Sequence, residues 1–229
     1  MRNIASLVFS LGLAFMLLAI AAQLGFGHAP MLIGTDILAG AEGEVGAANI
    51  VTAVVFGYRG FDTLGELSIL FAAATAAGLV LGHRRSGAKD DPEGGLVLSA
   101  GADLLFPLLL LVGIYIVIHG HLTPGGGFQG GVILAAAFFI SVIAKPSLRL
   151  DHGAISVIEG LAGAGFILIG LWALMEDGSF LQPMLGHGVL GQLASAGTIP
   201  LLSSAVGLKV GSELAGLLAH ISESEAGEP

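Results

Sequence analysis

A lysine and a glutamate stand four residues apart in the apolar stretch VGLKVGSE, residues 206–213. This spacing places Lys209 and Glu213 on one face of a helix, where they can form an ion pair. Two further carboxylates, Glu159 and Asp103, stand near the ends of other apolar stretches. Neighbouring carboxylates and a desolvated lysine change one another's proton affinity, which suits an ion relay. The alternative is charge neutralisation that holds helices in register, and it is favoured for Glu213 and Asp103.

A second group of charges lies in YRGFDTLGE, residues 58–66. Arg59, Asp62 and Glu66 are spaced i, i+3 and i+7, so a continuous helix presents them on one face. A charged group at membrane depth costs roughly 3 kcal/mol on insertion scales and persists where it is paired or hydrated. These three residues therefore belong either to an ion path or to an ion pair that anchors a helix at the membrane surface.

Two histidines, His119 and His121, follow another apolar stretch, and His119 stands one helical turn after Tyr115. Imidazole titrates near neutral pH, so the two side chains suit a proton relay. A metal site needs more ligands, and no carboxylate stands near them in the sequence. We expect no metal, and helix capping at the membrane surface is the favoured alternative to a relay.

The stretch TPGGGFQGG, residues 123–131, holds five glycines and one proline. This composition disfavours a helix interior and predicts a re-entrant segment or a tight turn packed against protein. A phosphate-binding loop of the GxxxxGK[ST] type requires a lysine that is missing here, so nucleotide binding is excluded. The predicted structural loop comprises Pro124, Gly125, Gly126, Gly127 and Phe128.

The composition shows what surrounds these charges. Of the 229 residues, 55% are hydrophobic and 11% are charged, whereas a soluble domain carries about 25% charged residues. The mean hydropathy is +0.92. The chain is therefore an integral membrane protein. The absence of cysteine excludes disulfides and thiolate chemistry, the net charge of −9 argues against nucleic acid as a partner, and no HExxH motif or serine–histidine pair indicates an enzyme.

Six apolar stretches approach the roughly 20 residues that a helix needs to cross a bilayer. They are residues 4–24, 61–81, 99–119, 128–144, 154–174 and 199–218. The first is longer than the about 7–15 residues of a signal-peptide core, so we expect a retained span. A shorter apolar piece, residues 47–56, either extends the second span outward or lies at the membrane surface. The sequence thus predicts an all-α membrane protein with about six transmembrane helices.

The basic residues predict the orientation of these spans. Six of the eight lie on one side of the alternating pattern, namely Arg2, Arg84, Arg85, Lys89, Lys145 and Arg149. The loops 25–46, 120–127 and 175–198 contain no lysine or arginine. By the positive-inside rule, both ends of the chain are cytoplasmic. The other two basic residues, Arg59 and Lys209, lie in or beside spans.

Three stretches resemble a known family of ion transporters. HGHLTPGGGFQGGVILA, residues 119–135, resembles the B subunit of Mrp-type multisubunit Na+/H+ antiporters, as do AGTIPLL, residues 196–202, and VGLKVG, residues 206–211. NIVTAVVFGYRGFDTLGE, residues 49–66, resembles the C-terminal segment of the Mrp A subunit, which is also similar to the small E subunit of membrane-bound hydrogenases. We therefore predict a two-span module (1–90), a four-span B-like module (91–221) and a flexible acidic tail (222–229).

This resemblance implies a small subunit of a cation/proton antiporter module in the cell membrane. It implies Na+ and H+ as transported ions, no cofactor, and large antiporter-like and small C-, E-, F- and G-like subunits as partners. By motif match, Arg59 and Glu66 carry charged positions of the A-type segment, while Pro124, Phe128 and Lys209 carry B-type positions. The alternative is a helical adaptor without an ion path, in the membrane arm of a hydrogenase-like respiratory complex whose catalysis resides in other subunits.

Overall fold

A computed structural model describes residues 2–23, 32–81, 94–145, 148 and 150–225, and these residues form helices without strands. Six of the helices are long and apolar enough to cross a membrane: α1 (Arg2–Gln23), α4 (Gly60–Leu81), α5 (Leu96–Ile118), α6 (Gly127–Ala144), α7 (His152–Asp177) and α8 (Ile199–Glu225). The expected all-α fold with six spans is confirmed within this part of the chain.

The chain divides into two units, residues 1–37 and residues 38–229. In the first unit, α1 is a continuous apolar helix of 22 residues. None of its hydrophobic span is buried, so its surroundings must be lipid or other protein rather than water.

The segment before α4 differs from the sequence-based expectation. The predicted loop 25–46 contains the helix α2 (Leu32–Val45), whose glycines and acidic residues dilute the apolar pattern. A short helix α3 (Ile50–Thr52) and a π-helical turn η1 (Ala53–Tyr58) follow, after a bend of 86°. Residues 47–56 therefore do not simply extend α4, because Arg59 breaks the helix with φ −128° and ψ 32°.

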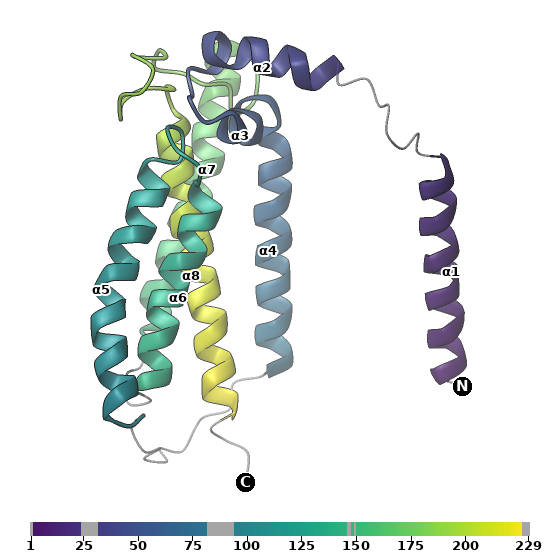
Figure 1. The fold of residues 1–229 in the computed structure, drawn as a ribbon, viewed down its shortest axis with the longest axis vertical. Helices are drawn as coiled ribbons and strands as arrows, with labels where there is room; N and C mark the ends of the chain where they lie inside the picture. The colour runs from purple at the N-terminus through teal and green to yellow at the C-terminus, as the bar shows by residue number, and fades with distance from the viewer. Residues whose placement is uncertain (1, 24–31, 82–93, 146–147, 149, 226–229) are drawn as a thin grey trace. The chain divides into compact units, whose positions relative to one another are not determined.

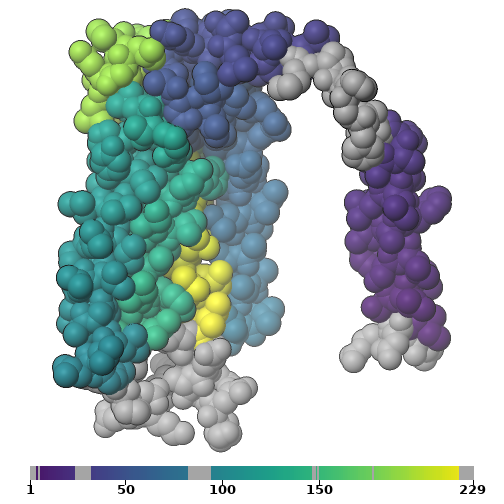
Figure 2. Space-filling model, viewed as in Figure 1, coloured from purple at the N-terminus to yellow at the C-terminus, as the bar shows by residue number. Residues whose placement is uncertain are grey.

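Helices α4 to α8 form the bundle of the second unit (Figure 1), and they alternate in direction. Helix α8 packs against α6, α7, α4 and α5. Half of the α8 span is buried, against 6% of the α4 span, so the core of the bundle lies around α8. Figure 2 shows α8, in yellow, between α6 and α4 on one face of the bundle. The N-in, C-in orientation stays a prediction.

Glycines let α6 pack closely against α5 and α8. A Cβ atom at Gly130 would lie 2.4 Å from Val117 Cγ2 on α5. A Cβ at Gly131 would lie 2.8 Å from Val210 Cβ on α8. Small residues at these contacts allow neighbouring backbones to approach, which is how membrane helices gain packing energy without a hydrophobic driving force.

Two short polar side chains join the segment before α4 to the loop after α5. The amide of Asn49 donates to the carbonyls of Gly120 at 2.7 Å and Thr123 at 2.9 Å. The hydroxyl of Thr52, which is buried, also donates to the Gly120 carbonyl at 2.6 Å. These bonds satisfy carbonyls that an irregular loop would otherwise bury without partners. They hold residues 49–52 against the loop between α5 and α6 at one end of the bundle.

Two predicted parts of the chain are not fully covered by the described residues. The predicted boundary between the modules, at residue 90, lies outside the described residues. The first four residues of the predicted tail, 222–225, continue α8, and residues 226–229 lie outside the described part of the chain. The division into modules therefore stays a prediction, while the helix is longer than expected.

The glycine contacts predict unequal effects of alanine at two positions. In Gly130→Ala the new methyl group meets Val117, and overpacking costs about 1–3 kcal/mol. In Gly165→Ala on α7 no atom lies within 4 Å of the new methyl, so stability stays equal or rises. Thermal unfolding in detergent checks this difference, and equal midpoints for the two variants would contradict the packing argument.

The joining hydrogen bonds predict that Asn49→Asp destabilises the protein. The aspartate keeps the acceptor that caps Val51, whose N–H lies 3.1 Å from the Asn49 side-chain oxygen, but it loses both donors. The Gly120 carbonyl keeps the Thr52 hydroxyl as a donor, but the Thr123 carbonyl loses the Asn49 amide and the new carboxylate faces both carbonyl oxygens, so we expect a cost of about 1–3 kcal/mol. The measurement is the thermal unfolding midpoint of Asn49→Asp. An unchanged midpoint would show that the bonds to the loop contribute nothing to stability.

Candidate functional site

Lys209 lies between two carboxylates in the interior of the bundle. Its Nζ atom is 3.2 Å from Oε1 of Glu159 on α7 and 3.1 Å from Oε2 of Glu213 on α8. The side chains of Lys209 and Glu213 are 10% and 2% exposed, and that of Glu159 is 21% exposed. Lys209, Glu159 and Glu213 are called the charged triad below. The structure thus pairs Glu159 with Lys209, a contact that spacing alone left open.

Local structure on three helices positions the triad. The i, i+4 spacing on α8 aligns Lys209 with Glu213. On α7, Gly163 lies one turn beyond Glu159, and a Cβ there would come within 3.3 Å of the lysine stem. Helix α4 contributes Phe71, whose ring centroid is 4.9 Å from the Lys209 ammonium. The ammonium of Lys209 is therefore held by its carboxylate partners and by the ring of Phe71, and Gly163 leaves room for the lysine stem.

The triad has one more acid than base. With all three groups ionised it carries a formal charge of −1, and an uncompensated charge in a membrane interior is costly. The Glu213 oxygens make no hydrogen bond of good geometry within the described residues, although the ammonium lies 3.1 Å away. The Lys209 ammonium therefore attracts the Glu213 carboxylate, but the carboxylate oxygens still lack a hydrogen-bond donor of good geometry in the described part of the chain. One added proton or monovalent cation would make the triad neutral.

Asp103 does not join the triad. It lies near the beginning of α5, and its Oδ1 is 2.5 Å from Nζ of Lys145 at the end of α6. The two side chains are 64% and 36% exposed. This pair ties α5 to α6 at one end of the bundle, and an exposed pair of this kind adds little stability.

The second predicted cluster is only partly assembled. Arg59 forms an ion pair with Asp62 across the first turn of α4. Glu66 lies one turn further along α4 and is exposed, and it makes no hydrogen bond or ion pair within the described residues. Arg59 does not share a continuous helix with Asp62 and Glu66, because α4 begins only at Gly60. The three residues therefore do not form the single helical face that a continuous helix would give.

The two histidines lie in different surroundings. His119 caps the end of α5, and its ring stacks on Tyr115 at 4.1 Å. His121 is fully buried, and neither ring nitrogen makes a hydrogen bond of good geometry within the described residues. Burial lowers the pKa of His121, and the nearby backbone of Gln192 and Leu193 offsets only part of that shift. His121 is therefore a neutral packed side chain at pH 7, while His119 has the expected capping position.

The glycine-rich loop is shorter than expected. Gly127 and Phe128 form the first turn of α6, because the glycines of that turn contact α5 and α8 instead of making a bend. Gly125 and Gly126 have φ angles of +143° and +137°, a region that other residues rarely adopt. Pro124 is exposed. The residues that hold this loop, Asn49 and Thr52, escaped sequence reasoning, since a single polar residue before a helix signals only a cap.

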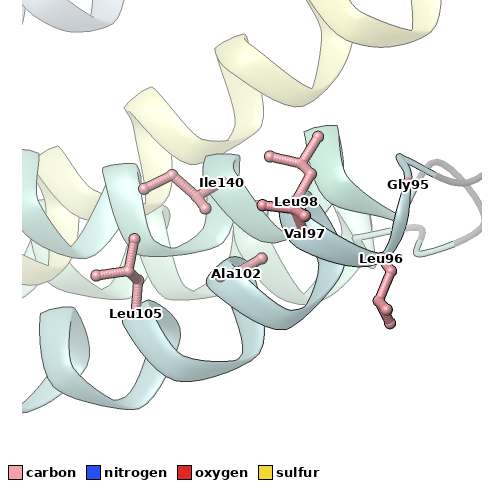
Figure 3. A pocket seen from close by; sticks show the side chains of 8 residues that line it. Gly95, Leu96, Val97, Leu98, Ala102, Leu105 and Ile140 are labelled. Atoms are coloured by element: carbon pink, nitrogen blue, oxygen red, sulfur yellow. The ribbon is translucent and has the colours of Figure 1, made fainter.

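An apolar hollow lies away from the triad, between the beginning of α5 and α6 (Figure 3). Its lining includes Leu98, Ala102 and Leu105 of α5 and Ile140 of α6. All eight lining residues have apolar side chains or none. The hollow therefore offers no group that could hold or transfer an ion.

Comparisons with known proteins agree with this arrangement. A chain of an archaeal respiratory membrane complex, the membrane-bound sulfane sulfur reductase, is 40% identical with a TM-score of 0.80, covering 96% of this chain and 97% of that one. A chain of the Mrp complex from Dietzia sp. DQ12-45-1b is 27% identical with a TM-score of 0.75, covering 100% of this chain and 27% of that one.

A relative from Rhizobium meliloti has a name that combines the A and B subunits of a probable K(+)/H(+) antiporter. It is 26% identical, covering 89% of this chain and 23% of that protein. The chain thus spans about a quarter of the length of this relative and of the Dietzia chain. Residues 97–216 match a family described as a domain related to the MnhB subunit of Na+/H+ antiporters. The expected resemblance to the B subunit is confirmed, and the chain belongs to this MnhB-related family of membrane antiporter subunits.

Proposed function

We propose that the chain is an ion-translocating membrane subunit of a cation/proton antiporter module and that the charged triad lies on its ion path. The observation that carries this proposal is the buried excess of carboxylate over ammonium around Lys209. A site with a formal charge of −1 in apolar surroundings favours uptake of one positive charge. Lys209 supplies a tethered cation that competes with the incoming one for the same carboxylates.

The triad accounts for exchange of unlike cations. A proton bound to Glu159 or Glu213 and a monovalent metal ion near the same carboxylates exclude each other by charge repulsion. Their alternate binding gives antiport when the two ions reach the triad from different sides. Family membership supports Na+ as the cation, while the K(+)/H(+) name of the Rhizobium relative supports K+.

Partner subunits complete this module. Glu66 is an exposed carboxylate on a transmembrane helix, and such groups face protein, water or a paired charge rather than lipid. We infer that the Glu66 face of α4 contacts a larger antiporter-like subunit in the cell membrane. The higher identity to the archaeal respiratory chain favours the membrane arm of a respiratory complex, in which catalysis resides in other subunits.

A second candidate function is a helical adaptor without an ion path. The close contacts of the α6 glycines with α5 and α8 favour the adaptor function, because they make the bundle rigid. In that case the triad serves only to hold α7 against α8. The two functions differ in how they respond when the excess charge is removed.

The first test removes the excess carboxylate without removing the ion pair. In Glu159→Gln the Lys209–Glu213 pair remains and the site becomes neutral. We expect normal assembly and a fall in cation/proton exchange in vesicles of at least about tenfold, equivalent to roughly 1.4 kcal/mol of barrier. The matched control is Glu176→Gln, an exposed glutamate on the same helix. Full exchange by Glu159→Gln would support the adaptor instead.

The second test identifies the neighbour of Glu66. The chain has no cysteine, so Glu66→Cys introduces its only thiol, to which a photo-crosslinking reagent can be attached. In the purified complex we expect a crosslink to a larger antiporter-like subunit. Leu67→Cys, at a position that is 3% exposed, is the control and should give none. Crosslinking of Glu66→Cys to lipid alone would refute the predicted contact.

A further inference from the structure

A pair of histidines lies on the same seam between α7 and α8 as the charged triad. The rings of His152 on α7 and His220 on α8 have centroids 4.6 Å apart, with an interplanar angle of 57°. His152 precedes Glu159 by seven residues, and His220 follows Glu213 by seven. Seven residues are two helical turns, so on each helix the histidine and the glutamate share a face, separated by about 10 Å along the axis.

The residues between the two pairs are apolar, and the gap named below is the position where Ile155 faces Gly216. Ile155 lies between His152 and Glu159 on α7, and Gly216 lies between Glu213 and His220 on α8. A Cβ built at Gly216 would be 3.3 Å from Cγ2 of Ile155, so these two residues face each other across the seam. Because Gly216 has no side chain, Ile155 packs here against the backbone of α8, and a change of its rotamer would open this contact.

We propose that His152 and His220 form a proton-exchange site that connects the aqueous end of the bundle with the charged triad through the gap at Ile155 and Gly216. Imidazole takes a proton from water and releases it near neutral pH. The proton then passes through transient water in the gap to a carboxylate of the triad, and the imidazole returns to its neutral form. No other reactant is needed. This inference rests on the proposed function, since it supplies the triad with its proton.

The ionisable residues near this route stand at the ends of helices, and two of them, Glu223 and Glu225, follow His220 in the last turns of α8. Asp151 stands next to His152, and its carboxylate caps α7 by accepting hydrogen bonds from the N–H groups of Gly153 and Ala154. Lys145 at the end of α6 is paired with Asp103. From residue 67 to residue 81, α4 carries no ionisable side chain, and none stands between the histidines and the triad on α7 or α8. The histidines are thus the nearest proton carriers to the triad on this seam.

A thiol placed in the gap tests the route directly in the intact complex. Ile155→Cys introduces the only cysteine of this chain, which should react with a cationic, membrane-impermeant methanethiosulfonate reagent from the side bearing the histidines. Modification should stop proton-coupled exchange. Val157→Cys is the control, since this position is 60% exposed on the outer face of α7 and should stay unreactive in lipid. An Ile155→Cys thiol as unreactive as that of Val157→Cys would overturn the proposal.

The second measurement is the pH profile of exchange. In the double variant His152→Gln/His220→Gln, proton transfer should slow about tenfold or more and the dependence of exchange on pH near neutrality should flatten. The control is His187→Gln, in the loop that joins the end of α7 to the beginning of α8, which should keep the profile. An unchanged profile in the double variant, with Glu159→Gln inactive, would reject the histidine site while leaving the triad's role intact. If the double variant fails to assemble, the reactivity of the Ile155→Cys thiol decides whether the proposed route exists.

Discussion

The interior of the bundle is organised around one ammonium group placed between two carboxylates. Burying Lys209 in apolar surroundings is unfavourable unless its charge is matched, and Glu159 and Glu213 match it from two helices. That requirement brings α7 and α8 into contact at one depth, and Phe71 brings α4 to the same point. Removing Lys209 would leave two carboxylates without a counter-charge, a change that costs about 3–5 kcal/mol in buried pairs, so this contact is more restrictive than the surrounding dispersion contacts.

Close packing of α6 fixes the position of α8, and with it the position of Lys209 relative to Glu159. The backbone of α6 lies against α5 through Gly130 and against α8 through Gly131, so neither neighbour can shift without a clash. At the end of the bundle, Asn49 and Thr52 bind the carbonyls of the loop between α5 and α6. The segment with A-type resemblance therefore positions the segment that belongs to the MnhB-related family, and the two parts act as one structural unit.

The distribution of charge separates structural pairs from groups suited to ion movement. The exposed pairs Arg59–Asp62 and Lys145–Asp103 are neutral and lie at the ends of helices, where water can reach them. The triad has a surplus carboxylate and two of its three side chains are buried, and the pair of histidines lies on the same seam. Glu66 is exposed on a membrane helix, which points to partner subunits. The chain resembles chains of a respiratory complex and of an Mrp complex, in line with a subunit of a larger membrane assembly.

The sequence by itself determined the membrane location, the six spans, the family and the pairing of Lys209 with Glu213. These depend on composition and on spacing along one helix, which local periodicity records. It could not place Glu159 against Lys209, separate Asp103 from the triad, or show that Asn49 holds a loop 71 residues away. It also placed Gly127 in a loop, whereas this residue begins α6. Contacts between helices depend on rotation and depth, and these follow from glycine packing across the bundle, which only the tertiary structure decides.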